Sequence, residues 1–547
     1  MKVHCLPFAK IPHTTRLFSD FLGYSPSLHP FFPHSRQFPD WMREESENLS
    51  YDASRRQAVA DILERQNKSW HASPQTLANL DRLRKGASAI VTGQQVGLFG
   101  GPTFSIYKAL TAVKLAEEAT SAGVDAVPVF WLATYDHDLA EVNHVSLPQS
   151  DGSLETLAIS SQSVPGAPVS TVRLGDEILP VLEQAALLLG DTEATTFLCE
   201  SYVPGETLGT AFARLYGKLF ADHGVIVLDA SDGALHKIAE PVYRAAISRG
   251  EELTDALLAR GEALEAAGYH QQVKVTHSST LLFTLRDGVR MPIHRHPQSA
   301  GTFSIGSEDA FEKISEAELL DRLAAKPEQF SPNVLLRPIV QDFLLPTIAY
   351  TGGAAEVAYF AQAGAVYEIL LGRVTPIVPR YSATIVEPKL QRLLERYGLT
   401  VLDVFTGADA LRQTLASQSL PADLQAAFDH TRKTLDSNLS VVIDQLARLD
   451  RTLVDAAETS RSKIQHQLEK LHAQAARAEL QKAEVVGRHA EILSQALYPD
   501  KGLQERAVAG IYFMARYGRG LLDLLRDSMR PDCHEHRIVE FQEPAAR

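Results

Sequence analysis

The stretch ASAIVTGQQVGLFGGPTFS, residues 87–105, decides the fold. Its first six residues are small or apolar, as in a buried strand, and they lead into a loop with four glycines. A helical pattern follows from Pro102 to Gly123. The run VPVFWL at 127–132 is a second buried strand about 35 residues after the first, a spacing typical of two parallel strands joined by a helix.

Three further runs have the character of buried strands, and they lie at residues 224–229, 334–339 and 376–379. With the first two they predict an α/β fold built on a doubly wound parallel sheet. Two stretches of different pattern, about 145–210 and 240–330, interrupt this series. We expect them to be insertions into the sheet domain.

The pattern along the chain predicts seven segments. They are 1–145 for an N-terminal lead-in and the first part of the core, 146–212 for an insertion, 213–240 for core, 241–330 for a second insertion with a hairpin around 286–288, 331–415 for core, 416–500 for a coiled coil, and 501–547 for a C-terminal segment that returns to the core.

A heptad pattern marks the coiled coil. Residues 422–498 contain no proline and one glycine. Apolar residues step by four and three through Leu435, Leu439, Val442, Leu446, Leu449 and Leu453, and the series continues through Ile464, Leu468 and Leu471. A turn near 450–452 would make an antiparallel α-helical hairpin that projects and forms a dimer. An ordinary pair of long core helices is the alternative.

Composition narrows the classes of protein. Hydrophobic residues at 45% and charged residues at 22% are typical of a folded protein. The net charge of −14 would repel a nucleic-acid backbone, so we expect no nucleic-acid partner. We also expect no membrane partner, since no apolar run is long enough to span a bilayer. Three cysteines and the lack of a signal-peptide pattern favour the cytoplasm.

The glycine-rich loop is the first candidate site. Thr92, Gly93, Gln94, Gln95, Gly97 and Gly101 lie where a strand turns into a helix. Free N–H groups at 103–105 would point toward an anion, and Lys108 could add charge. A purely structural turn is equally compatible with the pattern.

The second candidate is a polar cluster after the strand at 127–132. It contains Asp136, His137, Asp138, Asn143 and His144. Ligands bind beyond the carboxyl ends of strands in such sheets, which is where this cluster lies. On a helix, His137, Glu141 and His144 would share a face and could hold a metal. A polar helix start capped by Asp136 or Asp138 is the alternative.

A third group begins at Arg337 and Gln341 and continues through Tyr350, Gly352, Gly353 and Glu356. Arg337 could bind a carboxylate or phosphate in bidentate fashion, or it could form a structural salt bridge. The sequence Cys533-His534-Glu535-His536 resembles a metal site but lacks a second pair of ligands. We expect it to be a solvated tail.

The chain resembles the bacillithiol-biosynthesis cysteine-adding enzyme family, BshC. The matching segments follow one another through most of the chain: 92–97 to 101–102, 129–131 through 136–138 to 143–144, 201–209, 268–273, 330–338, 350–362 and 498–506. Two positions depart from the family pattern: Tyr135 replaces an acidic residue, and Ala354-Ala355 replaces Pro-Gly.

The resemblance implies a Rossmann-like core with connecting insertions and a coiled-coil arm that makes a homodimer. It also implies a ligase that adds L-cysteine to the amine of glucosaminyl-malate in the last step of bacillithiol biosynthesis. Activation of the carboxylate by ATP is expected, with Mg²⁺ only alongside the nucleotide and no metal in the fold itself. The HIGH and KMSKS signatures of class I synthetases are absent, so adenylation chemistry is not carried over.

We expect His137 to be the general base toward the amine, with Asp136 or Asp138 orienting its ring. The cluster at 136–144 should share one crevice with Arg337 and Gly352. Residues expected to bind substrate or nucleotide are Thr92, Gly93, Gln94, Gln95, Gly97, Gly101, Lys108, Asn143, His144, Arg337, Gln341, Tyr350, Gly352, Gly353, Glu356 and Arg380. The competing hypotheses are a metal-dependent hydrolase or amidase built on the cluster from Asp136 to His144, and a non-catalytic assembly protein.

Overall fold

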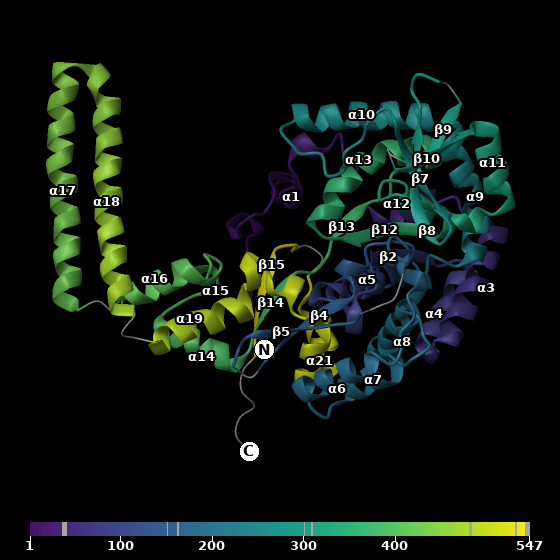
Figure 1. Cartoon of the computed structure of the whole chain (residues 1–547), viewed down its shortest axis with the longest axis horizontal. Coiled ribbons are helices and arrows are strands. Elements are labelled where there is room, and N and C mark those ends of the chain that lie inside the picture. The colour runs from purple at the N-terminus through teal and green to yellow at the C-terminus, as the bar shows by residue number, and fades with distance from the viewer. Residues whose placement is uncertain are drawn as a thin grey trace.

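The computed structural model describes residues 1–34, 41–149, 151–160, 164–299, 301–307, 310–418, 421–480, 484–530 and 533–541. A body with sheets and helices carries a long helical arm that stands apart from it (Figure 1). Of the predicted C-terminal segment, residues 542–547 lie outside the described residues. No helix in the described ranges is long and apolar enough to cross a membrane.

The central sheet has five parallel strands in the order β13-β12-β2-β3-β6. Their bounds are Ile377–Pro379 for β13, Thr347–Gly352 for β12, Ser88–Gln94 for β2, Ala126–Leu132 for β3 and Ile226–Asp229 for β6. The chain builds β2, β3 and β6 in one direction, then returns to the other side of β2 for β12 and β13. This reversal confirms the doubly wound sheet and puts its switch point between β2 and β12.

The strand predicted at 334–339 is wrong. Helix α12, Arg337–Leu344, begins there, and the sheet strand is β12 instead. The side chain of Asn333 accepts hydrogen bonds from the N–H groups of Leu335 and Leu336 and so supports the helix start. Pro338 suits the first turn of a helix, and a short apolar run does not by itself separate a strand from a buried helix.

Both faces of the sheet are covered. The strands β2, β3 and β12 are almost entirely buried, and alternate residues enter different apolar clusters: Val129 and Trp131 one, Phe130 and Leu132 another. Helix α5, Thr103–Ser121, links β2 to β3, and α13, Ala354–Leu371, links β12 to β13. Both helices begin at the end of the sheet where the switch point opens.

The segments predicted to be insertions contain strands and helices outside the central sheet. The first holds the hairpin β4 (His144–Pro148) and β5 (Leu154–Ala158) with helices α6 (Ile178–Leu189), α7 (Glu193–Ser201) and α8 (Leu208–Leu219). The second holds α9 (Gly233–Ser248), α10 (Gly250–Ala266), β7 (Ser279–Arg286), β8 (Val289–Arg295), β9 (Thr302–Ser307), β10 (Ala310–Ser315), α11 (Glu316–Ala325) and β11 (Phe330–Pro332). The turn between β7 and β8 has positive φ at Asp287 and Gly288, which confirms the predicted hairpin.

A small sheet joins the two ends of the chain. Strand β15, His536–Glu540, pairs antiparallel with β1, Lys2–Leu6, and parallel with β14, Ala383–Val386. The prediction of a solvated tail at 533–536 is therefore wrong, because His536 is fully buried between these strands. Isolated strands of this length have no local pattern that reveals their partners.

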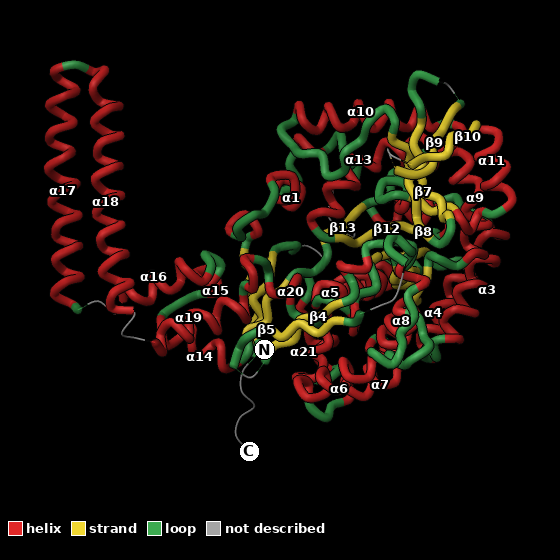
Figure 2. The backbone as a smooth tube through the Cα atoms, viewed as in Figure 1, coloured by secondary structure: helices red, strands yellow, loops and turns green. Residues whose placement is uncertain are grey.

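Helices fill the remaining body. Those before β2 are α1 (Arg16–Leu22), α2 (Met42–Asn48), α3 (Ala53–Ser69) and α4 (Pro74–Lys85). Those near the end are α20 (Gln504–Ala507), α21 (Gly510–Tyr517) and α22 (Gly520–Ser528). Figure 2 shows α20 and α21 beside the strands of the body, and α20 contacts both α5 and β14.

The arm is an antiparallel helical hairpin. It consists of α17 (Ala422–Leu449) and α18 (Val454–Leu480), and its base contains α14 (Pro388–Tyr397), α15 (Val401–Val404), α16 (Ala408–Gln418) and α19 (Glu484–Leu497). The turn falls at the predicted residues, where the side chain of Asp450 accepts a hydrogen bond from the Thr452 N–H. Ile443, which is not a seam position, is buried in the hairpin. Five positions of the predicted seam are exposed, namely Val442, Leu449, Leu453, Ile464 and Leu471.

Two histidines are buried in a neutral form. His536 hydrogen bonds to the hydroxyls of Ser382 and Thr384, and His236 hydrogen bonds to the hydroxyl of Tyr243. Burial lowers the pKa of each imidazole to about 4. Above pH 6.5 the lowered pKa does not reduce the free energy of unfolding, because the imidazoles are then unprotonated in both the folded and the unfolded chain.

We expect the free energy of unfolding to fall as the pH drops from about 6.5 toward 4, because the unfolded chain then binds protons that the folded chain excludes. Each histidine should contribute about 2 kcal/mol of this loss between pH 7 and pH 5. Chemical denaturation at both pH values measures it. His536→Gln should lose less stability than wild type over this interval, and exposed His430→Gln should match wild type. The same loss in all three proteins would contradict the assignment.

Candidate active site

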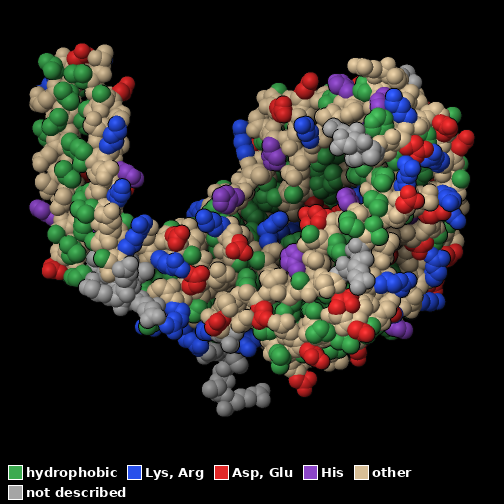
Figure 3. Space-filling model, in the orientation of Figure 1, with side chains coloured by type: hydrophobic (Ala, Val, Ile, Leu, Met, Phe, Trp, Pro, Cys, Tyr) green, Lys and Arg blue, Asp and Glu red, His purple; other side chains and the backbone are tan. Residues whose placement is uncertain are grey.

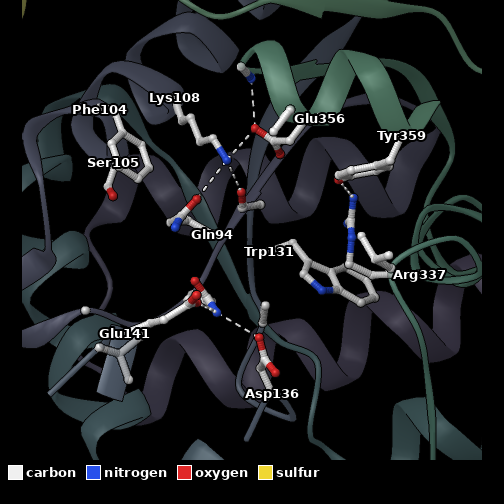
Figure 4. A pocket seen from close by; sticks show the side chains of 18 of the residues that line it. Gln94, Phe104, Ser105, Lys108, Trp131, Asp136, Glu141, Arg337, Glu356 and Tyr359 are labelled. Atoms are coloured by element: carbon white, nitrogen blue, oxygen red, sulfur yellow. Dashed lines mark hydrogen bonds and ion pairs between the residues drawn. The ribbon is translucent and has the colours of Figure 1, made fainter. Parts of the chain in front are cut away.

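A cavity of about 780 Å³ opens beyond the carboxyl ends of β2, β3 and β12. This is the switch point of the sheet, where ligands bind in doubly wound folds. Figure 3 shows a hollow in the body with Lys or Arg and Asp or Glu side chains around it, and Figure 4 shows residues that line the cavity. The basic and acidic side chains of the cavity come from different parts of the chain.

The glycine loop packs against the body. The Thr103 N–H donates to the Val508 carbonyl, and the Ser105 N–H donates to the Pro102 carbonyl. Two of the three amides expected to be free for an anion are therefore engaged, and that expectation is corrected. A Cβ on Gly97 would lie 2.9 Å from the Gly101 Cα, so glycine is required at 97 for the loop to close on itself.

A buried ion pair crosses the switch point. The Lys108 ammonium donates to the Gly93 carbonyl at 2.7 Å and the Gln94 side chain at 2.8 Å, and it lies 2.6 Å from Glu356 (Figure 4). Burial lowers the pKa of Lys108 to about 8, although the attraction of Glu356 opposes that shift. Burial alone would raise the pKa of Glu356, but the charge of Lys108 outweighs it and holds that pKa below its usual value.

Glu356 has two further donors on its own side of the sheet. The Tyr350 hydroxyl donates to it at 2.5 Å and the Gly353 N–H at 2.8 Å, the latter closing the first turn of α13. The pair thus fixes the starts of α5 and α13 against each other. With all three ammonium hydrogens engaged, Lys108 organises the cavity wall.

Arg337 is a buried cation whose partners are neutral. Its guanidinium donates to the Gln341 side chain and to the Tyr359 hydroxyl, each at 2.9 Å, and lies 5.1 Å from the centre of the Tyr350 ring. Among the described residues no carboxylate forms an ion pair with it, so the alternative of a structural salt bridge does not hold. A buried charge with only neutral hydrogen-bond partners is unfavourable, so Arg337 is a candidate to bind an anionic ligand.

Two more arginines face the cavity. Arg380 donates to Glu505 at 2.6 Å, and Glu505 also accepts from the Ser382 hydroxyl and the Ala383 N–H, each at 2.9 Å. Arg506 lines the cavity beside the ring of Phe104. Site reasoning from the sequence missed Glu505 and Arg506, although both lie in the 498–506 segment of the family resemblance.

The opposite wall is acidic. The Gln95 amide donates to Asp136 and to Glu141, each at 2.7 Å, and all three residues line the cavity. Arg290, from β8 of the second insertion, was also missed. It reaches this wall, where its guanidinium lies 3.2 Å from His137 Nδ1 and 3.7 Å from Asp136. No local pattern around Arg290 indicates a site.

The guanidinium of Arg290 can only donate, so His137 Nδ1 is the acceptor and the neutral ring carries its hydrogen on Nε2. His137 lies beside the cavity wall, next to Asp136, at an Nδ1–Oδ1 distance of 3.5 Å. Asp138 caps the short turn Leu139–Glu141.

Several predicted residues lie outside the cavity lining. They are Thr92, Gly101, His137, Asp138, Asn143, His144, Gln341 and Gly352. Those that line it are Gly93, Gln94, Gln95, Gly97, Lys108, Asp136, Arg337, Tyr350, Gly353, Glu356 and Arg380. Thr92 donates to the Thr351 carbonyl and Gln341 holds Arg337, so both support the site from behind.

The described residues contain no group of three His, Cys, Asp or Glu side chains that could hold a metal ion. The helical spacing expected for His137, Glu141 and His144 does not form, because a single turn is followed at once by strand β4. The three side chains that the hypothesis of a metal-dependent hydrolase requires as metal ligands are therefore not on one helix face.

Two polar atoms of the cavity wall are buried with no acceptor beyond each other. Within the described ranges, Trp131 Nε1 and the Tyr135 hydroxyl have no hydrogen-bond partner apart from the interaction between these two side chains. Both side chains line the cavity close to the region of Arg337, whose charge acts on Tyr135. Burial raises the pKa of Tyr135 to about 12, so its hydroxyl is a donor at neutral pH. A buried hydroxyl hydrogen without an acceptor makes Tyr135 a candidate to donate to a ligand oxygen.

We expect Lys108→Met to lower the free energy of unfolding by about 3–5 kcal/mol, because it leaves the Glu356 carboxylate buried without its partner. The double variant with Glu356→Gln should recover part of that loss. Lys85→Met, which breaks an exposed pair with Asp81, should change stability by less than about 1 kcal/mol. Denaturant titration measures all three, and equal effects for Lys108 and Lys85 would refute the role of the buried pair.

Two family descriptions match the chain: "Bacillithiol biosynthesis BshC, N-terminal Rossmann-like domain" over residues 1–381 and "Bacillithiol biosynthesis BshC, C-terminal coiled-coil domain" over residues 383–541. Relatives from Koribacter versatilis, Solibacter usitatus and Salinibacter ruber are each named "Putative cysteine ligase BshC". They are 47%, 37% and 35% identical to this chain, with 98% of it covered each time and 99%, 100% and 98% of the relatives. The chain belongs to the bacillithiol biosynthesis BshC family.

Proposed function

We propose that this protein is a carbon–nitrogen ligase that joins L-cysteine to the amine of glucosaminyl-malate, the last step of bacillithiol biosynthesis. The names of its relatives support the ligase class. The choice of substrate rests on Arg337, a buried guanidinium without a carboxylate partner among the described residues. Malate supplies two carboxylates, and an arginine binds a carboxylate through paired hydrogen bonds.

The charge of the cavity supports one orientation of the substrate. The malate end lies toward Arg337, where the Tyr135 hydroxyl has a hydrogen without an acceptor among the described residues. The sugar amine lies toward the acidic wall formed by Asp136 and Glu141. In this orientation each charged end of the substrate faces the opposite charge.

The amine must lose a proton before or during its attack on the cysteine carbonyl carbon. We place this proton on Asp136, whose carboxylate lines the cavity. His137 Nδ1 already accepts a hydrogen bond from Arg290, so this atom is not available to take the proton. His137, our candidate base from sequence, then acts as a donor through Nε2 near the same wall.

Activation of the cysteine carboxylate requires a co-substrate, for which we propose ATP, with Mg²⁺ accompanying it. Arg380 and Arg506 are the residues that would hold its phosphates, because both face the cavity beside Phe104. When bound, the nucleotide supplies the leaving group that a free carboxylate lacks. An enzyme that uses ATP and free cysteine is expected in the cytoplasm.

We predict that the protein, incubated with glucosaminyl-malate, L-cysteine and ATP, forms an amide whose mass is the sum of the two substrates minus one water. Arg337→Gln should lower kcat/KM for glucosaminyl-malate on the order of 100-fold, because a charge-assisted pair is lost. Mass spectrometry of the product at several glucosaminyl-malate concentrations measures this change in kcat/KM.

The matched control is Arg322→Gln, an exposed arginine that pairs with Glu312 in the second insertion. It should leave the rate unchanged. Melting curves show whether Arg337→Gln is folded, and Arg337→Lys, which keeps the charge, should recover part of the rate. A folded Arg337→Gln with wild-type kcat/KM would refute the assignment of the malate site.

We also propose that the arm makes a homodimer. Val442 and Leu449 lie seven residues apart on α17 and are 51% and 78% exposed, while Ile464 and Leu471 lie seven apart on α18 and are 39% and 55% exposed. Each pair forms a stripe along its helix. Figure 3 shows hydrophobic side chains along the arm, and apolar stripes of this kind favour a partner helix.

We predict a dimer in solution for wild type and a folded monomer for the double variant Val442→Glu and Leu449→Glu, since charges on the stripe would be buried by association. Light scattering at tens of micromolar measures the mass. Leu187→Glu, at an 85% exposed position on α6, should remain dimeric. A monomeric wild-type protein would contradict the proposal.

A further inference from the structure

Two of the three cysteines lie next to each other although they are at opposite ends of the chain. Cys5 belongs to β1, and Cys533 precedes β15, its neighbour in the small sheet. Their sulfur atoms are 3.6 Å apart. Cys5 is exposed and Cys533 is partly exposed, so small molecules in solution can reach the pair.

The surrounding contacts hold the two segments together. Cys5 is the register partner of Arg537, and the Arg537 guanidinium donates to the Cys533 carbonyl at 2.6 Å. The Phe8 N–H donates to the Glu535 side chain at 2.7 Å. A disulfide needs a sulfur–sulfur distance of about 2.05 Å, so closure requires an approach of about 1.5 Å between the side chain of Cys5 in β1 and that of Cys533, which precedes the paired strand β15.

We propose that Cys5 and Cys533 are a redox-active pair that forms a reversible disulfide by exchange with a low-molecular-weight disulfide. One cysteine thiolate attacks the small disulfide, forms a mixed disulfide and releases one small thiol. The other cysteine loses its proton, attacks the first cysteine's sulfur and releases the second small thiol. Two protein thiols are thereby oxidised, and one small disulfide is reduced to two thiols.

The disulfide would fasten the first strand to the sheet that supports the cavity. His536 in β15 bonds to the Ser382 hydroxyl, and that hydroxyl also donates to Glu505. Glu505 in turn holds Arg380 in the cavity wall. Oxidation therefore cross-links the small sheet at its β1 edge, whereas Arg380 is positioned at the other edge, next to β14. A cross-link at the β1 edge limits opening of that strand.

The test incubates the full-length protein with hydroxyethyl disulfide, blocks remaining thiols by alkylation and maps peptides by mass spectrometry. We expect a peptide that joins Cys5 to Cys533 with the loss of two hydrogen atoms, and its disappearance with dithiothreitol. Hydrogen exchange of the β1 amides should slow on the order of tenfold in the oxidised protein.

The third cysteine supplies the matched control. Cys199 lies on α7 in the first insertion, and Cys199→Ser should keep the cross-link. Cys5→Ser should stop at a mixed disulfide on Cys533. Separate mixed disulfides on Cys5 and Cys533 in the wild-type protein, without a cross-linked peptide, would overturn the proposal. Unchanged exchange of β1 in a fully cross-linked sample would overturn the fastening of the strand.

Discussion

The buried pair of Lys108 and Glu356 is the interaction on which the cavity depends. It joins the helix after β2 to the helix after β12, the two helices that diverge at the switch point. Two charges removed from water are stable only when their geometry is good and their remaining hydrogens are satisfied. Gly93, Gln94 and Tyr350 provide those contacts. The ion pair therefore holds the neighbouring residues of the cavity wall in fixed positions.

Acidic and basic side chains are distributed unevenly around the cavity. Arg337, Arg380 and Arg506 lie on the side of β12 and the C-terminal segment. Asp136 and Glu141 follow β3, and Arg290 reaches the same wall, 3.7 Å from Asp136. Glu505 neutralises Arg380, whereas Arg337 has only neutral partners among the described residues. An elongated substrate with carboxylates at one end and an amine at the other matches this distribution.

Local patterns in the sequence predicted the sheet, the insertions and the arm, because strands and heptads leave short-range periodicity. They failed where the outcome depends on distant partners. The run at 334–339 became a helix start once Asn333 capped it, and His536 became buried through β1 and β14. The prediction of the site failed for the same reason. Lys108 and Glu356 follow glycine motifs, but Arg290 reaches the cavity from a hairpin with no distinctive sequence.

We propose that the switch-point cavity binds glucosaminyl-malate with its carboxylates on Arg337. The most direct measurement is a crystal structure of the full-length protein with glucosaminyl-malate. We expect density for the malate end within hydrogen-bond distance of the Arg337 guanidinium and for the sugar amine on the side of Asp136. An occupied cavity with the amine beside Arg337, or a ligand bound elsewhere with this cavity empty, would contradict it.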